Sequence, residues 1–335
     1  MGIQPRVELK PDLLSVVTPA YNEEEVLGAL EQRVRAVCED LDQQYELILV
    51  NDGSRDRSLL VMLSLQETNP NITIVNLSRN FGKEIALTAG LDHARGDAIV
   101  ILDADLQDPP ELMVRMLELW REGYDVVYAQ REAREGETWL KRKTANLFYL
   151  LMERIGPVKM PRDTGDCRLM SRKVVDALCA LREHHRLMKG LFAWVGYPST
   201  SISYRREKRA AGKTKWNYWK LWNLSLEGIT AFTTIPLRMT TYIGCVVAAL
   251  SFLFILFVVA KKLLFGEAVQ GYPTLVVVVL LLGGIQLMAL GVIGEYLGRV
   301  FDETKGRPLY FVESVRPADL AAKDQARRRA RLARQ

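Results

Sequence analysis

The sequence predicts an α/β domain with a mainly parallel sheet, followed by interfacial helices and two C-terminal transmembrane helices. Short apolar runs alternate with amphipathic segments through the first 130 residues, and two long stretches without charge lie near the C-terminus. Hydrophobic residues make up 49% and charged residues 25% of the 335 residues. These ordinary values exclude collagen-like and fully disordered classes, and the length suggests about two domains.

The predicted strands recur about 30 residues apart, with a helical pattern between each pair. The strands are Leu13–Thr18, Glu46–Val50, Ile72–Asn76, Ala98–Leu102 and Asp125–Ala129. The helical segments are Glu24–Cys38, Asp56–Thr68, Lys83–Ala94 and Pro110–Glu122. This alternation is typical of βαβ units, in which ligands bind beyond the carboxyl ends of the parallel strands.

Polar segments follow each of the first four strands. They are Pro19–Glu25, Asn51–Ser54, Ser78–Lys83 and Asp103–Asp108. Asn, Asp and Ser also cap helices and form turns, which is the preferred interpretation for Glu24, Ser54 and Asp108. Capping does not explain the two carboxylates of Asp103 and Asp105. Such a pair can share a Mg²⁺ ion with substrate phosphates, and Gln107 can add a third oxygen.

Other nucleotide and metal sites are disfavoured. No Gly-x-Gly-x-x-Gly follows the first strand, and Glu207 stands where a phosphate-binding loop ending in Gly212-Lys213-Thr214 would need glycine. The four cysteines are scattered without metal-ligand spacing, and three histidines are too few to favour a histidine-based zinc site. No signal-peptide pattern precedes the first strand, and reduced thiols are expected.

The C-terminal part predicts a membrane anchor. Met239–Ala260 and Ala268–Gly294 carry no charge, and each exceeds the roughly 20 apolar residues that a spanning helix needs. The expected crossings are Thr240–Ala260 and Tyr272–Ile293. The glycines Gly283, Gly284, Gly291 and Gly294 permit close helix packing, so a homo-oligomer is expected.

Residues on both sides of the crossings indicate how the chain meets the membrane. Three tryptophans and a tyrosine between Trp216 and Trp222 predict an interfacial helix over Trp216–Ile235, with a buried core helix as the alternative. Basic residues after Tyr296 favour the cytosolic side. Nucleic-acid binding is the rival interpretation of the tail that begins at about Pro317, disfavoured because no aromatic residue lies among its charges.

Several motifs, taken in order, resemble family 2 glycosyltransferases. The matching segments are Val17–Glu24, Val50–Ser54, Arg79–Lys83, Asp103–Glu111, Thr164–Met170, Arg206–Arg209, Gly212–Trp216 and Gly294–Arg299. The resemblance runs from about Leu13 to Val312. It is greatest to the polyisoprenyl-phosphate branch, which includes bactoprenol glucosyltransferases and dolichol-phosphate mannose synthases.

The resemblance implies a GT-A fold and inverting transfer of a hexose from a nucleotide sugar to polyprenyl phosphate at the cytosolic face of the inner membrane. Glucose from UDP-glucose is the first expectation, and mannose from GDP-mannose is an alternative. A non-catalytic partner of a lipid-sugar flippase is the alternative from another class. A processive polysaccharide synthase is disfavoured because the Gln-x-x-Arg-Trp motif is missing.

The resemblance also assigns residues. The nucleotide sugar would contact Pro19, Tyr21, Glu23, Asp52, Lys83, Asp103, Arg131 and Lys143. The acceptor phosphate would contact Arg206, Arg209 and Lys213. Mg²⁺ or Mn²⁺ would bind Asp103, Asp105 and Gln107. Cys167 departs from the family pattern, which has an aromatic residue there.

Asp166 matches the proposed catalytic aspartate. Because a phosphate monoester has a second pKa of about 6, the acceptor hardly needs a general base, and Asp166 is expected to orient the sugar or the acceptor. A structural salt bridge to Arg168 or Arg172 is the alternative. The expected organisation is a catalytic domain over 1–210, an interfacial region over 211–237, a transmembrane pair over 238–296 and a basic cytosolic tail over 297–335.

Overall fold

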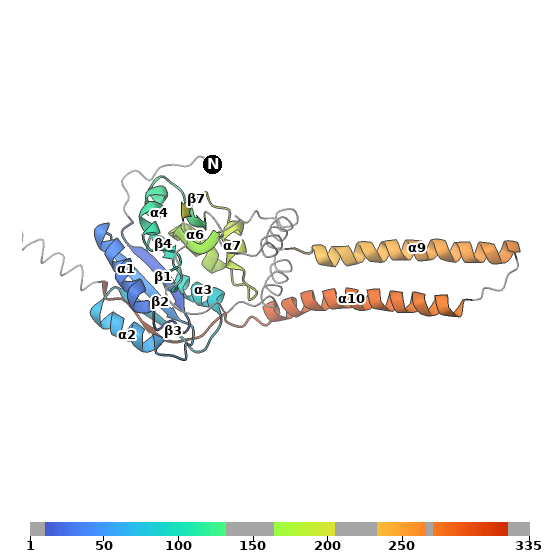
Figure 1. The fold of residues 1–335 in the computed structure, drawn as a ribbon, viewed down its shortest axis with the longest axis horizontal. Coiled ribbons are helices and arrows are strands. Elements are labelled where there is room, and N and C mark those ends of the chain that lie inside the picture. The colour runs from blue at the N-terminus through green and yellow to red at the C-terminus, as the bar shows by residue number, and fades with distance from the viewer. Residues whose placement is uncertain (1–10, 132–163, 205–232, 266–270, 321–335) are drawn as a thin grey trace, which may run out of the picture.

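A computed structural model describes residues 11–131, 164–204, 233–265 and 271–320 (Figure 1). An eight-stranded mixed sheet runs in the order β7-β5-β6-β4-β1-β2-β3-β8. Its strands are β1 Leu14–Ala20, β2 Tyr45–Asn51, β3 Ile72–Leu77, β4 Ala98–Ile101, β5 Val126–Arg131, β6 Thr164–Ser171, β7 Ser199–Tyr204 and β8 Val312–Arg316. The central strands β4, β1, β2 and β3 are parallel, which confirms the predicted α/β class.

Helices cover both faces of the sheet. They are α1 Leu27–Asp40, α2 Ser58–Thr68, α3 Lys83–His93, α4 Leu112–Arg121, α6 Arg172–Ala180 and α7 Met188–Trp194. One hydrophobic cluster joins α1, α2 and α4 to the sheet, and a second joins α3, α6 and α7 to the opposite face. Strands β1 to β4 are therefore buried on both sides, which explains their continuous apolar sequences.

Three strands were not predicted. β6 pairs antiparallel with both β4 and β5, and it carries the Thr164–Ser171 segment into the middle of the sheet. β7 and β8 are edge strands, and β8 is exposed along its whole length. Edge strands lack a two-sided apolar environment, so their polar sequences resemble loops. Val312–Arg316, expected in the basic tail, thus belongs to the sheet, while residues 321–335 lie outside the described part.

Two long helices, α9 Ile235–Phe265 and α10 Tyr272–Thr304, run side by side away from the α/β domain (Figure 1). The windows Leu237–Lys261 and Leu281–Thr304 are long and apolar enough to cross a membrane. Neither window is buried against the rest of the protein, so these are not core helices of the α/β domain.

The helix pair is attached to the α/β domain at the ends near it. The Tyr296 hydroxyl donates to the carbonyl of Thr233 at 2.7 Å, which ties α10 to the start of α9. The backbone N–H of His184 donates to Glu303 Oε1 at 2.7 Å, and the His185 ring lies 3.2 Å from Asp302. The C-terminal end of α10 therefore contacts the segment that leads into α7.

Candidate active site

The loops that follow β1 and β2 are joined by hydrogen bonds. The backbone N–H of Asn22 donates to Ser54 Oγ at 3.0 Å, and the N–H of Arg55 donates to Asn22 Oδ1 at 2.8 Å. Gly53 turns with φ +63°, and a Cβ there would lie 2.4 Å from the carbonyl carbon of Arg79, so only glycine fits. Of the predicted nucleotide contacts, Pro19 is buried in β1, whereas Tyr21 and Glu23 are half-buried in this loop region.

Asp52 holds the loop that leads into α3. Its carboxylate accepts the N–H of Phe81 at 2.7 Å, the N–H of Gly82 at 3.0 Å and the Asn80 side-chain amide at 2.9 Å. The residue is only 2% exposed, and burial raises the pKa of its carboxyl above the usual value. Asp52 therefore shapes the entrance to α3, and a direct contact to a nucleoside stays a prediction.

The Asp103–Asp108 loop after β4 has a constrained backbone. The N–H of Gln107 donates to Asp105 Oδ1 at 3.2 Å. Between them Leu106 has φ +56°, an uncommon conformation for a bulky residue, and its side chain is buried in the core. Such a conformation persists only where the surroundings enforce it, and it often marks a functional loop.

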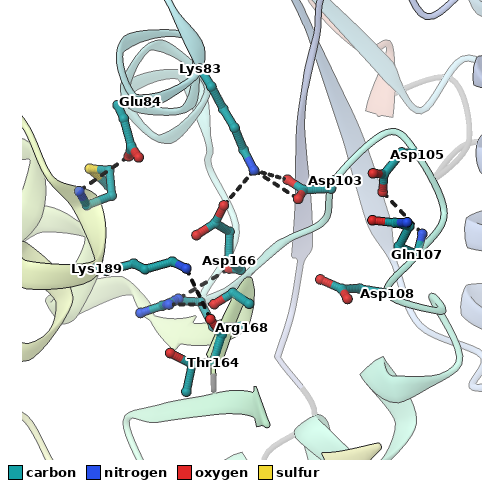
Figure 2. A network of polar contacts seen from close by, with 12 residues as sticks. Lys83, Glu84, Asp103, Asp105, Gln107, Asp108, Thr164, Asp166, Arg168 and Lys189 are labelled. Atoms are coloured by element: carbon teal, nitrogen blue, oxygen red, sulfur yellow. Dashed lines mark hydrogen bonds and ion pairs between the residues drawn. The ribbon is translucent and has the colours of Figure 1, made fainter. Parts of the chain in front are cut away.

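Lys83, Asp103 and Asp166 meet at the carboxyl ends of the central strands. Their side chains point toward one another from α3, the loop after β4 and strand β6 (Figure 2). Lys83 Nζ lies 2.7 Å from Asp103 Oδ1, 2.8 Å from Asp103 Oδ2 and 2.5 Å from Asp166 Oδ2. Three residues distant in sequence and predicted for the site are therefore brought together. The Lys83 side chain is 45% exposed, so a ligand can reach it.

Opposing effects set the ionisation of this cluster. Burial would raise the pKa of Asp166, but Lys83 and then Lys189 outweigh it and hold the pKa well below its usual range. Burial raises the pKa of Asp103, and Lys83 only partly opposes this increase. Burial alone would lower the pKa of Lys83, but the two carboxylates have the larger effect and raise this pKa above its usual value. Lys83 is thus a fixed cation and Asp166 a fixed anion at neutral pH.

Two further cations lie beside Asp166. The buried guanidinium of Arg168 donates to the carbonyls of Asp166 and Gly165 at 3.2 and 3.1 Å. Burial lowers its pKa to about 10, so it stays charged at neutral pH. Lys189 Nζ donates to the carbonyl of Thr164 at 3.1 Å. Lys189 was not predicted from the sequence, because α7 lies far along the chain and carries no motif.

The alternative prediction for Asp166, a structural salt bridge to Arg168 or Arg172, is not what the structure shows. Arg168 bonds backbone carbonyls, and Arg172 donates to the carbonyl of Gly96 at 2.9 Å through Nε. The Asp166 carboxylate is instead paired with Lys83. Cys167 stands where the resemblance leads one to expect an aromatic residue, and its side chain is fully buried in the core. Burial raises the pKa of its thiol.

The remaining predicted residues divide into two sets. Arg131 ends β5, and its Nε donates to the Tyr204 hydroxyl at 3.3 Å. Lys143, Arg206, Arg209 and Lys213 lie outside the described residues, as does most of the predicted interfacial helix.

The donor atoms of the Asp103–Asp108 loop fit a hard divalent cation. Asp103, Asp105 and Gln107 offer two carboxylates and an amide oxygen from one loop. Within the described residues, no cluster of three or more His, Cys, Asp or Glu side chains could form an all-protein site. Mg²⁺ and Mn²⁺ prefer oxygen ligands, and Mg²⁺ sites commonly use one or two carboxylates plus substrate phosphates. The Lys83 ammonium lies 2.7 Å from Asp103 Oδ1, so the negative charge of Asp103 already has one positive partner.

Comparison with known proteins identifies the family. Residues 15–179 match the family described as Glycosyl transferase family 2. An uncharacterized glycosyltransferase of Synechocystis sp. is 53% identical over 302 residues, which cover 90% of this chain and 95% of that protein. A prophage bactoprenol glucosyl transferase homolog of Escherichia coli K12 is 46% identical over 303 residues, covering 90% of this chain and 99% of that protein.

Solved structures are more distant. The crystal structure of mannosyl-3-phosphoglycerate synthase from Rubrobacter xylanophilus superposes with a TM-score of 0.47 at 19% identity, covering 64% of this chain and 71% of that chain. The sequence matches extend through both the α/β domain and the two apolar helices. Because 53% of the residues are identical to a glycosyltransferase over nine-tenths of this chain, the chain belongs to glycosyltransferase family 2.

Proposed function

We propose that the protein transfers glucose from UDP-glucose to a polyprenyl phosphate, with inversion, at the cytosolic face of the membrane. The observation that carries the proposal is the Lys83–Asp103–Asp166 cluster in a chain that matches a bactoprenol glucosyl transferase homolog along almost its whole length. In the reaction the bond from the anomeric carbon to the diphosphate breaks, and a bond to an oxygen of the acceptor phosphate forms.

The donor diphosphate would lie against the Asp103–Asp108 loop. Asp103, Asp105 and Gln107 would hold Mg²⁺ or Mn²⁺, which when bound offsets the negative charge that develops on the leaving diphosphate. Lys83 is accessible from solvent and charged, so it can donate to a phosphate oxygen in the same region. Arg131 and Lys143 would provide further positive charge for the phosphates.

Asp166 would act on the acceptor side of the anomeric carbon. Its carboxylate is fixed by Lys83 and strongly favours the ionised form. A general base works best when its pKa is near the operating pH, and Asp166 is far from that condition. Because the acceptor phosphate is largely dianionic at neutral pH, orientation by Asp166 is the role that its environment supports.

The acceptor carries a second negative charge that must approach the donor diphosphate. Lys189 and Arg168 lie beside Asp166 and reduce the electrostatic repulsion between the two phosphates. Arg206, Arg209 and Lys213 would bind the acceptor phosphate itself, as the family pattern implies.

We further propose that α9 and α10 cross the membrane. Their 31 and 33 residues correspond to about 46 and 50 Å at roughly 1.5 Å per residue, which exceeds the hydrocarbon core of about 30 Å. The Tyr296 contact keeps the domain-side ends of both helices together, and the Glu303 contact ties the end of α10 to His184 of the α/β domain. This arrangement supports a catalytic domain and flanking segments on the cytosolic side, and the glycines of α10 support close packing in a homo-oligomer.

The test is a transfer assay with the full-length protein in lipid nanodiscs. UDP-glucose, other UDP-hexoses and GDP-mannose, each radiolabelled, are offered with undecaprenyl phosphate, and labelled lipid is extracted and quantified. We expect UDP-glucose to give the highest kcat/KM. Higher kcat/KM with GDP-mannose would replace the sugar assignment. Absence of labelled lipid with every donor would contradict the catalytic proposal, with a bactoprenol glucosyl transferase assayed in parallel as the control.

A further inference from the structure

Three polar side chains from separate elements converge on Gly165. The Tyr204 hydroxyl, at the end of β7, donates to Asp108 Oδ1 and accepts from Arg131 Nε at 3.3 Å. A Cβ on Gly165 would lie 3.0 Å from Asp108 Oδ2, 3.4 Å from Arg131 Nη2 and 3.7 Å from the Tyr204 hydroxyl. These groups therefore pack directly against the residue that precedes Asp166.

The hydrogen-bond roles in this cluster are complementary. A phenol hydroxyl has one donor and two acceptor positions, and Tyr204 uses its donor on a carboxylate and an acceptor position on a guanidinium. Burial, assisted by the bond to Asp108, raises the pKa of Tyr204, so the hydroxyl keeps its proton. Tyr204 and Asp108 are 5% and 3% exposed, respectively. Buried hydrogen bonds to charged groups are among the stronger ones in proteins.

The position of Asp108 connects this cluster to the active site. Asp108 ends the loop that carries Asp103 and Asp105, and Leu106 in the same loop has the uncommon φ of +56°. A loop of this kind needs anchors on both sides to keep its geometry. Strand β4 supplies one anchor through its core residues, and the Tyr204–Asp108 hydrogen bond supplies the other.

We propose that Tyr204 is a positioning residue for the transfer reaction, because its hydroxyl holds the Asp103–Asp108 loop and Arg131 in register with Asp166. This role rests on the proposed function of the same site. Tyr204 is not placed to touch the reacting atoms. It acts through Asp108 on the loop that would hold the donor diphosphate. It also holds Arg131, which would supply positive charge near the same phosphates.

The chain offers a closely matched control. The Tyr310 hydroxyl donates to Asp92 Oδ2 at 2.6 Å, and Arg182 donates to both oxygens of the same carboxylate. This is also a tyrosine–aspartate–arginine cluster, and its tyrosine is half-buried. Asp92 lies nine positions after Lys83 on α3, about 14 Å along the helix at roughly 1.5 Å per residue. Tyr310→Phe therefore removes a similar bond far from the site.

The experiment compares Tyr204→Phe, Tyr310→Phe and wild type in three measurements. Thermal unfolding reports stability, steady-state transfer reports kcat and KM, and calorimetry reports the Kd of UDP in the presence of Mn²⁺. We expect both variants to fold and to lose a similar amount of stability. Only Tyr204→Phe should lose about ten- to a hundredfold in kcat, as small displacements of reacting groups do. Its Kd for UDP should also rise at least threefold, since Asp108 loses the hydroxyl that anchors the loop.

A double-mutant cycle with Asp108→Asn identifies the path of the effect. If Tyr204 acts through Asp108, the double variant should lose no more kcat than the worse single variant. Fully additive losses would overturn the proposal, as would kcat and Kd values in Tyr204→Phe that match those of Tyr310→Phe. If wild type transfers no sugar, the proposed function fails, but the UDP affinities of the same variants still decide whether Tyr204 positions the loop.

Discussion

Lys83 Nζ lies 2.5 Å from Asp166 Oδ2 and at the same time contacts both carboxylate oxygens of Asp103. One ammonium thus joins the loop expected to bind the donor diphosphate to the aspartate expected to act on the acceptor side. The two carboxylates would repel each other without it. Lys83 is therefore both a phosphate-binding candidate and the group that makes this arrangement of charges stable.

We predict that Lys83→Met abolishes measurable transfer and lowers the free energy of unfolding at neutral pH. The substitution keeps most of the side-chain volume but leaves two partly buried carboxylates without their shared cation. Removing one partner of a buried ion pair costs about 3–5 kcal/mol, and the partial exposure of Lys83 makes a smaller loss expected here. The control is Lys173→Met, which removes the 2.8 Å ion pair with Asp125 outside the site and should leave transfer unchanged.

The stability difference between wild type and Lys83→Met should depend on pH in a defined direction. The pKa of Asp166 is depressed in the folded protein, so its contribution is present above about pH 4 and is lost as the pH falls toward the folded value. The pKa of Lys83 is raised, so its contribution is present below about pH 10 and is lost above that. Urea unfolding between pH 3 and pH 10 should show the largest difference on a plateau from about pH 5 to pH 9. A difference that grows below pH 4 would contradict this assignment.

Asp105→Asn is the cleanest test of the divalent cation. An asparagine keeps an oxygen that can accept the Gln107 N–H but removes the negative charge from the donor set. Asp103→Asn is less informative because it also disturbs Lys83. We predict that Asp105→Asn weakens Mn²⁺ binding by at least about tenfold with little change in the melting temperature, since ligand charge governs affinity for hard cations. Electron paramagnetic resonance of free Mn²⁺ in the presence of UDP measures the Kd.

Chelation with EDTA should stop transfer in wild type, and added Mg²⁺ or Mn²⁺ should restore it. Full transfer in EDTA would contradict the role given to Asp103, Asp105 and Gln107.

Glu84 provides a pH test that does not involve the reaction. Its Oε2 accepts the N–H of Met188 at the start of α7, and burial, then the charge of Asp166, raises its pKa to about 7. An acid with a raised folded pKa stabilises the protein at low pH, and that contribution is lost as the pH rises from about 4.5 to about 7. Glu84→Gln keeps the acceptor and cannot ionise. It should therefore be more stable than wild type at pH 8 and similar to it at pH 4, as measured by thermal unfolding. If the variant and wild type were equally stable at both pH values, the raised pKa of Glu84 would be contradicted.

Local sequence patterns were sufficient to predict much of the fold. Strands β1 to β5 and helices α1 to α4 lie within a few residues of their predicted positions, because each combines a clear apolar pattern with burial against the sheet. β6 begins with polar residues that belong to the site, so its sequence lacks the continuous apolar pattern that predicts a buried strand. β7 and β8 form the edges of the sheet, where polar sequences are tolerated.

The site was predictable as a set of residues but not as a network. Motif resemblance identified Lys83, Asp103 and Asp166 one at a time, and nothing local in the sequence indicates that one ammonium joins the two carboxylates. The motif around Asp52 suggests a contact to the nucleoside, but it does not indicate that the Asp52 oxygens bind the Asn80–Gly82 loop. Lys189 and Tyr204 were missed because only the folded chain brings α7 and β7 to the site.

The negative charge of Asp166 can be removed without changing the size of its side chain. Asp166→Asn preserves the size of the side chain and an oxygen that can accept from Lys83, but removes the charge that offsets Lys83, Lys189 and Arg168. We predict a loss of at least about a hundredfold in kcat, typical of removing a fixed electrostatic contact in an active site, with UDP affinity largely preserved. The control is Asp176→Asn, which removes an exposed carboxylate 3.7 Å from Arg172 and should leave both values unchanged.

A pH–rate profile separates orientation from base catalysis. An aspartate whose pKa is held well below its usual range is a weak base at neutral pH, and the acceptor phosphate is already largely dianionic above its pKa of about 6. The loss in Asp166→Asn should therefore be similar at every pH from about 6 to about 9, because ionising the acceptor further restores nothing. If the missing group were a general base, rising pH would replace it and the variant would recover toward wild-type kcat. Such recovery would show that Asp166 removes a proton, whereas wild-type kcat at neutral pH would show that its pairing with Lys83 is structural alone.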